Sequence, residues 1–211
     1  MSAPAAEAVV LLHGAWMNRW VMGYLAHALR GEGFASQSLT YRTMRDALEV
    51  HLLRLSRRID SLDAEHVHLV GHSLGGVIVL RYLQRAPDRR IRRAVLLGAP
   101  VSGCRAAAGL ARRAGGELLM GQSLSVWRQP IQVSIDPRFE IGVIAGTGAL
   151  GLGRMVMRLP KPNDGVVCVD ETKFPGMRDH LTLPIGHSVM LVSPRVARQT
   201  ASFLRAGAFR R

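Results

Sequence analysis

The sequence has few cysteines and no long apolar run, and each shortage excludes a class of protein. Only two cysteines occur among the 211 residues. Cys104 and Cys168 stand far apart and lack the close spacing of a metal site. We expect neither a metal centre nor a disulfide, and interpret both cysteines as small buried side chains or free thiols. No apolar stretch approaches the length of a membrane span.

The amino-terminal segment also lacks the features of a secretory signal. Its first seven residues carry no basic cluster, and the apolar run that follows covers only residues 8–12. A signal peptide needs a positively charged start and a longer apolar segment, so we expect a cytoplasmic protein. The length and the 48% hydrophobic content fit one globular domain over residues 1–211, with no repeat, linker or second domain.

Lysine is scarce too, since Lys161 and Lys173 are the only lysines. The formal net charge is nevertheless +13, and arginine supplies almost all of the positive charge. Such charge attracts anionic partners, including phospholipid surfaces, acyl carriers and nucleic acid. We favour the alternative that arginine reflects genome composition and is spread over solvated helix faces. The one dense cluster, residues 89–93, has no aromatic interleaving and no nucleic-acid motif. We expect no nucleic-acid partner and at most weak contact with an anionic membrane surface.

What the sequence does contain is concentrated in residues 67–80. A β-branched apolar run meets the sequence Gly-His-Ser-Leu-Gly at 71–75, and an apolar helical pattern follows at once. This layout is typical of a nucleophile elbow, a sharp strand-to-helix turn that exposes a serine, here Ser73. A Cβ at Gly71 or Gly75 would clash as the strand and the helix close on each other. Chance matches to the five-letter pattern seldom fall between a buried strand and a helix, so we interpret Ser73 as a nucleophile.

Strand and helix patterns alternate along the rest of the chain. Strands are predicted at 9–12, 34–41, 94–97, 141–145 and 181–185, besides the one before the elbow; helices are predicted at 20–30, 44–62, after the elbow and at the carboxyl end. This alternation predicts an α/β fold with a mostly parallel central sheet flanked by helices on both faces.

Several residues are predicted to mark the helix ends. Thr43, followed three residues later by Asp46, resembles a capping box for the second helix. Pro87 is expected to close the helix after the elbow. Ser193 and Pro194 are expected to cap and begin the last helix.

The pattern weakens between residues 101 and 140. Residues 106–120 look helical but contain three glycines. We consider two interpretations, a small cap or lid that covers substrate and an ordinary surface helix. Leu118, Leu119, Met120 and Trp127 would offer apolar contacts to a substrate.

A serine hydroxyl needs a general base, and an acid must orient that base. Where an elbow serves catalysis the chain order is serine, acid, histidine, which leaves His180 and His187 as bases. Active groups gather beyond the carboxyl ends of parallel strands. This rule favours His187, which follows the predicted strand at 181–185, over His180, which precedes it.

Asp164 is the favoured acid because it follows the predicted strand at 141–145 and precedes His187. Turn chemistry alone would also explain its Asn-Asp-Gly setting. The competing carboxylates are Asp136, Asp170, Glu171 and Asp179.

Two backbone N–H groups are expected to bind an oxyanion. Leu74 stands at the start of the helix after the elbow, where free N–H groups favour negative charge. Ala15 lies in the loop after the first strand, where Gly14 lets the backbone turn inward, and Trp16 is the alternative donor.

Other residues around the expected site receive supporting roles. We predict that Trp16, Met17 and Val101 contact substrate. Trp20, like Trp16, is expected to wall the pocket or pack in the core. The histidines His13 and His72 are interpreted as structural supports.

Together these motifs resemble the small bacterial α/β-hydrolases of the lipase/esterase type. The similarity runs from Val9 to Arg205, and it is carried by the following segments: 13–14, 71–76, 97–100, 163–167 and 186–188. The resemblance implies an α/β-hydrolase fold with a triad of Ser73, Asp164 and His187. It also implies hydrolysis of a small-molecule or lipid acyl ester through an acyl-enzyme, with no metal or organic cofactor.

The resemblance leaves the exact reaction open. The same triad would also serve a thioesterase or an amidase, and the fold hosts non-catalytic binding proteins. There is little room for an extensive lid, so we expect short- to medium-chain esters to be cleaved faster than long-chain triglyceride.

Overall fold

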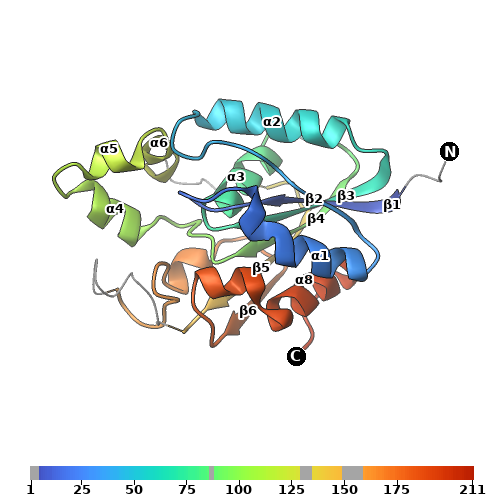
Figure 1. The fold of residues 1–211 in the computed structure, drawn as a ribbon. Coiled ribbons are helices and arrows are strands. Elements are labelled where there is room, and N and C mark those ends of the chain that lie inside the picture. Colours follow the sequence, from blue (N-terminus) through green and yellow to red (C-terminus); the bar gives the residue numbers. More distant parts are fainter. Residues whose placement is uncertain (1–4, 86–87, 129–134, 149–158) are drawn as a thin grey trace.

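The computed structural model describes residues 5–85, 88–128, 135–148 and 159–211 (Figure 1). Within these ranges one sheet has the strand order β2-β1-β3-β4-β5-β6, and every neighbouring pair is parallel. The strands are β1 (Ala5–Leu12), β2 (Ala35–Ser38), β3 (Ala64–His72), β4 (Ile91–Leu97), β5 (Glu140–Gly146) and β6 (Asp179–Leu183). All carboxyl ends therefore meet at one edge of the sheet.

Helices cover both faces of this sheet (Figure 1). On one face lie α2 (Leu48–Asp60) and α3 (Leu74–Leu83), and on the other lie α1 (Gly23–Gly31) and α8 (Pro194–Ala206). An apolar cluster fills the space on each side, so the strands are buried on both faces. The α/β fold and the parallel sheet predicted from the sequence are confirmed.

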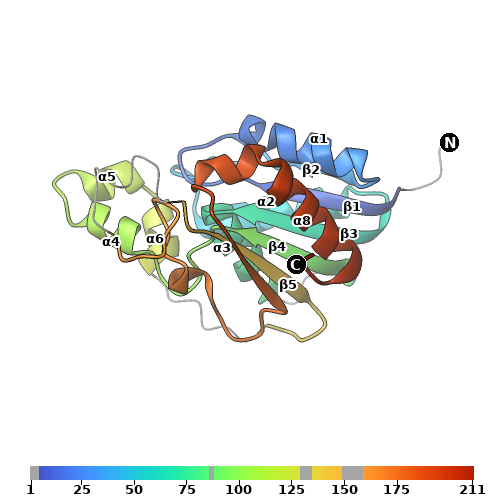
Figure 2. The ribbon, with the colours of Figure 1, turned by 90° about the horizontal axis from the view of Figure 1, so that it is seen from below.

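Three short helices lie beyond the carboxyl edge of the sheet (Figures 1 and 2). They are α4 (Arg105–Ala111), α5 (Gly116–Met120) and α6 (Ser123–Arg128). The single helix suggested for 106–120 is broken: α4 ends at Ala111, and Gly115, with φ 73°, stands in a left-handed conformation before α5 that a continuous helix cannot contain. Gly121, with φ 49°, ends α5. We call α4, α5 and α6 together the cap segment.

Within the described ranges, short 3₁₀ helices lie in the connections: η1 (Arg19–Met22), η2 (Asp170–Thr172) and η3 (Ser188–Val192). At the last helix the capping prediction is confirmed. Ser193 Oγ accepts a hydrogen bond of 3.3 Å from Val196 N, and Pro194 is the first helical residue.

The predicted capping box of the second helix is wrong, because α2 begins at Leu48. Asp46 instead forms an ion pair of 3.1 Å with Arg54. The carbonyl of Met44 accepts a hydrogen bond of 3.0 Å from Gln122 N. This contact with the α5–α6 connection holds the segment before α2 outside the helix.

Other sequence expectations have mixed outcomes. β2 is shorter than predicted because Tyr41 leaves the sheet and stacks on His13, with ring centroids 4.2 Å apart. Trp20 is 74% exposed, with the Arg19 guanidinium over its ring, so it does not pack in the core, and it does not line the Ser73 cavity. α3 ends at Leu83, and Pro87 lies outside the described residues.

Both cysteines are free thiols, as expected. No helix in the described ranges is long and apolar enough to cross a membrane.

Candidate active site

Ser73 joins β3 to α3 in a strained backbone conformation, with φ 53° and ψ −121°. Side-chain-bearing residues rarely adopt such a positive φ. The flanking glycines permit it: a Cβ on Gly71 would lie 2.5 Å from the Gly76 backbone, and one on Gly75 would lie 2.4 Å from the Leu12 carbonyl oxygen. The steric reason for both glycines, expected from the sequence, is present in the structure.

Hydrogen bonds hold this turn against the neighbouring strand. Ser73 N donates to Leu97 O at 2.9 Å, and Ser73 O accepts from Gly76 N at 3.0 Å. The surrounding structure thereby fixes a backbone conformation that costs about 1–3 kcal/mol. The Ser73 side chain is held at the carboxyl edge of the sheet.

Asp164 and His187 form a buried pair at the same edge. His187 Nδ1 lies 2.7 Å from Asp164 Oδ2, and His187 N donates to Asp164 O at 2.9 Å. His187 is 8% exposed and Asp164 is 1% exposed. Because a carboxylate only accepts, the short contact assigns the proton to Nδ1 and leaves the lone pair of neutral His187 on Nε2.

The second carboxylate oxygen of Asp164 belongs to a turn. Oδ1 accepts hydrogen bonds from Val166 N at 2.9 Å and Val167 N at 2.7 Å. The Asn163 side chain accepts from Gly165 N at 2.9 Å, and Gly165 has φ 97°. Turn chemistry and contact with a histidine are therefore compatible here, because each uses a different oxygen of Asp164.

Two further glycines let the strand ends approach this pair. A Cβ on Gly98, after β4, would lie 3.0 Å from Asp164 Oδ2 and 3.1 Å from His187 Nδ1. A Cβ on Gly146, at the end of β5, would lie 2.7 Å from Asp164 Cβ. Ser73, Asp164 and His187 thus follow β3, β5 and β6 at one edge, where parallel sheets assemble sites.

His72 links the elbow to His187. Its Nε2 donates to the His187 carbonyl oxygen at 3.1 Å, and the two ring centroids are 4.6 Å apart. Desolvation by burial, together with the nearby His187, holds the pKa of His72 well below its ordinary value. The hydrogen bonds of the described residues include none between Ser73 Oγ and His187 Nε2, a contact that in such sites often tightens only with substrate bound.

His180 lies at the other end of β6 from His187. It is the second residue of the strand, and its Nε2 is 2.9 Å from Thr172 Oγ1. Burial lowers its pKa from the ordinary value. The sequence argument that separated the two histidines by strand topology agrees with their positions.

The loop after β1 approaches the elbow closely. A Cβ on Gly14 would lie 3.1 Å from His72 Nδ1 and 3.2 Å from Ser73 Cβ. His13, just before it, stacks on Tyr41, and the Tyr41 hydroxyl donates to the His13 carbonyl oxygen. His13 and His72 thus both support backbone near Ser73. Ala15 and Ser73 line the same cavity.

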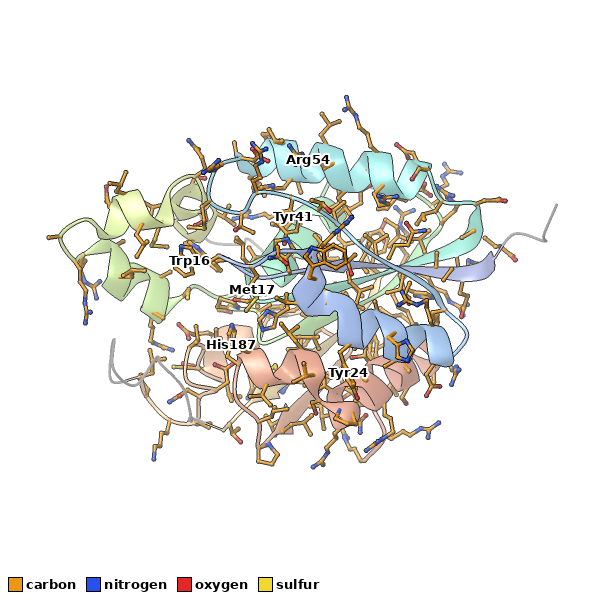
Figure 3. The ribbon with its side chains drawn as sticks, in the orientation of Figure 1. Trp16, Met17, Tyr24, Tyr41, Arg54 and His187 are labelled. Atoms are coloured by element: carbon orange, nitrogen blue, oxygen red, sulfur yellow. The ribbon has the colours of Figure 1, made fainter. Side chains whose placement is uncertain are left out.

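Trp16 continues this loop with φ 55° and a side chain directed to the cap segment (Figure 3). Its Nε1 donates to Leu119 O at 3.2 Å. Leu74 opens α3, and its N–H has no acceptor among the described residues, as expected for the first residue of a helix.

A cavity of about 320 Å³ contains Ser73 and has mostly apolar walls. The cap segment contributes the following residues: Ala106, Ala107, Leu110, Leu119, Met120 and Trp127. Val166, from the turn after Asp164, is far from the cap segment in the sequence but lines the same cavity. The volume is near the lower end of small-molecule pockets, about 300–1,000 Å³.

Of the three residues predicted to contact substrate, the structure brings only Trp16 to this cavity. Val101 is 1% exposed and packs in the core cluster beneath α3, so its side chain is not at the cavity surface. Met17 packs against the core cluster on the α1 and α8 face. Sequence reasoning missed Val166, whose role depends on the fold of the Asp164 turn.

Glu171, offered by the sequence only as a competing acid, ties the cap segment to that turn. It is buried, and its carboxylate accepts from Arg105 N at 2.6 Å and from Cys168 N at 2.7 Å. Arg105 also pairs with Asp170 at 2.8 Å. Both Glu171 carboxylate oxygens are therefore engaged in hydrogen bonds, and these bonds hold α4 beside the Asp164 turn.

Comparisons with known proteins agree with this architecture. The family model described as "Alpha/beta hydrolase family" matches residues 9–184. A curated relative, the 2-hydroxy-6-oxo-2,4-heptadienoate hydrolase of Pseudomonas putida, is 35% identical over 109 residues. That match covers 45% of this chain and 38% of the relative, so the chain spans well under half of the relative's length.

Solved structures with low sequence identity share the fold. The mature Bacillus licheniformis lipase BlEst2 superimposes with a TM-score of 0.75 at 16% identity, covering 98% of this chain and 94% of that one. Carboxylesterase CesB of Bacillus subtilis gives a TM-score of 0.55 at 20% identity, covering 94% and 84%. A lipase-esterase related protein of Clostridium acetobutylicum gives 0.66 at 13% identity, covering 97% and 95%.

Proposed function

The chain belongs to the alpha/beta hydrolase family, and from this premise we propose that it is a serine hydrolase of carboxylic esters. The observation that carries the proposal is the Asp164–His187 hydrogen bond of 2.7 Å, formed at the sheet edge that also presents the strained Ser73. A binding role would not require a buried acid to fix the tautomer of a histidine at the sheet edge where a serine lines a cavity.

In the proposed first step, Ser73 Oγ attacks the ester carbonyl carbon while His187 Nε2 accepts the hydroxyl proton. Asp164 keeps the Nδ1 proton in place and stabilises the imidazolium that forms. The new Oγ–C bond turns the carbonyl oxygen into an oxyanion. Backbone N–H groups of Leu74 and Ala15 are proposed to bind that oxyanion.

Collapse of the tetrahedral intermediate breaks the bond to the alcohol, and His187 returns its proton to the leaving oxygen. Water then attacks the acyl-enzyme, with His187 again taking a proton, and the second collapse releases the acid and restores Ser73 Oγ–H. No metal or organic cofactor takes part in the proposed reaction.

The apolar cavity supports an acyl group as the part of the substrate that it holds. Its walls from the cap segment offer hydrocarbon contacts and few polar ones. We infer that the cap segment, the described helical part of the range 101–140, is a small cap on this single domain rather than an extensive lid; residues 129–134 lie outside the described residues. Short- to medium-chain esters are the proposed substrates, and long-chain emulsions are expected to react more slowly.

A substrate panel tests the proposal. The purified protein is assayed on p-nitrophenyl acetate, butyrate, octanoate and palmitate, on a matched butyryl thioester and on a butyryl anilide. Ser73→Ala and Asp164→Asn are each expected to lower kcat by about ten-thousandfold or more. Ser125→Ala is the control, because this exposed serine bonds only to the Gln122 carbonyl.

Each outcome of the panel has a defined meaning. Fast ester turnover that depends on Ser73 supports the proposal. Exclusive turnover of the thioester or the anilide would replace the ester with that substrate class on the same residues. A folded protein with no turnover of any substrate would favour the non-catalytic binding protein.

A further inference from the structure

Three large apolar side chains are exposed together around one groove beside the candidate active site. Leu118 is 88% exposed, and Leu119 and Trp16 are each 55% exposed. They line a shallow groove with Met44 and Leu110. We call these five residues the α5 groove. Water-exposed apolar groups gathered in this way mark a surface for a partner.

The α5 groove lies next to the cavity that holds Ser73. Trp16, Leu110 and Leu119 line both spaces. The hydrogen bond from Trp16 Nε1 to Leu119 O closes the loop after β1 onto α5, and Figure 3 places Trp16 beside these cap helices. The groove and the Ser73 cavity therefore lie side by side and share apolar walls.

Positive charge flanks the groove. Arg42 and Arg45 stand on either side of Met44, and Arg112 and Arg113 precede α5; all four are exposed. Within residues 42–45 and 110–119 the only acid is Glu117. An apolar centre with an arginine rim complements a layer of anionic headgroups above hydrocarbon.

We propose that the α5 groove docks the protein on an anionic lipid surface, with Leu118 inserted among the acyl chains and the arginines at the headgroups. This orientation places the Ser73 cavity beside short- to medium-chain esters that partition into the lipid layer, so the substrate part of the inference rests on the proposed function. The docking itself requires only the groove and its charges.

Vesicle sedimentation tests the docking. The protein is mixed with vesicles of phosphatidylcholine alone or with phosphatidylglycerol, at low and high salt. The parent is expected to sediment with the phosphatidylglycerol vesicles and to be released in part by salt. Leu118→Ser is expected to weaken binding about tenfold, the effect of withdrawing one leucine from an apolar phase.

The chain offers a matched control for this variant. Leu53 on α2 is also exposed, at 52%, and lines neither the groove nor the Ser73 cavity. Leu53→Ser is expected to bind vesicles like the parent. The substrate contact considered for Leu118 from the sequence is wrong, because Leu118 is 88% exposed and lies outside the Ser73 cavity, whereas Leu119, Met120 and Trp127 line it. Leu118→Ser should therefore keep parental activity on a water-soluble ester.

Several results would overturn the docking. One is a parent that does not bind phosphatidylglycerol vesicles. Another is equal binding by Leu118→Ser and Leu53→Ser, which would indicate unspecific attraction by charge. A third is a parent that dimerises without lipid, ignores vesicles and becomes monomeric as Leu118→Ser, which would assign the groove to a second copy. Vesicle binding by a protein that hydrolyses no substrate would retain the docking and reject the enzyme.

Discussion

His72 and His187 are held together by a hydrogen bond of 3.1 Å from the His72 ring to the His187 carbonyl oxygen. The residue before the proposed nucleophile therefore supports the backbone that carries the proposed base. Since His72 Nε2 is the donor, Nδ1 carries the lone pair, and it faces Gly14 in the loop after β1. One buried imidazole thus contacts two of the segments that would surround a substrate.

Replacing His72 should disturb His187 without removing it. His72→Phe leaves a buried carbonyl without its donor, which should lower the free energy of unfolding by about 1–3 kcal/mol. The loss of support should lower kcat by up to about a hundredfold, since small misplacements of catalytic groups are costly. Steady-state kinetics and urea denaturation measure the two effects. His72→Gln, which keeps a donor, should recover part of kcat; parental kcat in folded His72→Phe would contradict the role.

The two candidate bases should differ sharply. His187→Ala should lower kcat by several orders of magnitude, about the effect of losing a triad member. His180→Ala loses only the contact with Thr172 and should retain most of the ester hydrolysis, with some loss of stability. Both variants are compared with the parent in the same kinetic assay after circular dichroism. Full activity of His187→Ala beside an inactive, folded His180→Ala would reverse the assignment.

The glycines of the chain should respond differently to an added methyl group. In Gly75→Ala the new Cβ meets the Leu12 carbonyl at 2.4 Å, and overpacking of this kind typically costs about 1–3 kcal/mol. Gly23→Ala is the matched control, because it has φ −58° and open space around its Cβ position. That variant should gain about 0.4–1 kcal/mol. Urea midpoints that rank the two variants in the opposite order would contradict the packing of the elbow.

Acidification should destabilise the fold through its buried histidines. Burial lowers the pKa of His68 from 6.5 to about 4, although Glu7 opposes the shift. The unfolded chain therefore binds more protons than the folded one between these values, and the free energy of unfolding falls as the pH drops through this window. The histidines whose pKa is lowered in the same direction are His13, His51, His72 and His180.

The contribution of His68 can be measured directly. His68→Leu should reduce the loss of unfolding free energy between pH 7 and about pH 5, where each histidine contributes at most about 1.4 kcal/mol per pH unit. Equal pH dependence in the parent and His68→Leu, measured by urea denaturation, would contradict the account of this histidine.

The features predicted correctly from the sequence are those encoded locally. The elbow is fixed by glycines within a few residues of Ser73, and the parallel sheet follows from apolar strands alternating with helices. The position of Ser73, Asp164 and His187 at one edge follows from the rule that parallel strands share a carboxyl edge. Short-range steric constraints and strand direction were therefore sufficient to predict most of the fold and the location of the candidate site.

The features missed depend on contacts between distant segments. Trp16 and Met17 are adjacent, yet only Trp16 reaches the cavity, because its positive φ turns it toward α5. Val101 follows β4 but packs inward. The start of α2 was misplaced because a hydrogen bond from Gln122 fixes Met44 outside the helix. None of these partners is specified by the local pattern of the residues concerned.

The most direct test of the central claim is covalent labelling of Ser73. A fluorophosphonate should react with an activated serine hydroxyl, with the Ser73 Oγ–P bond formed as fluoride leaves. Intact-mass spectrometry should show one adduct on the parent, peptide mapping should place it on Ser73, and Ser73→Ala should show none. A folded parent that takes up no adduct, or an adduct that persists in Ser73→Ala, would contradict the account.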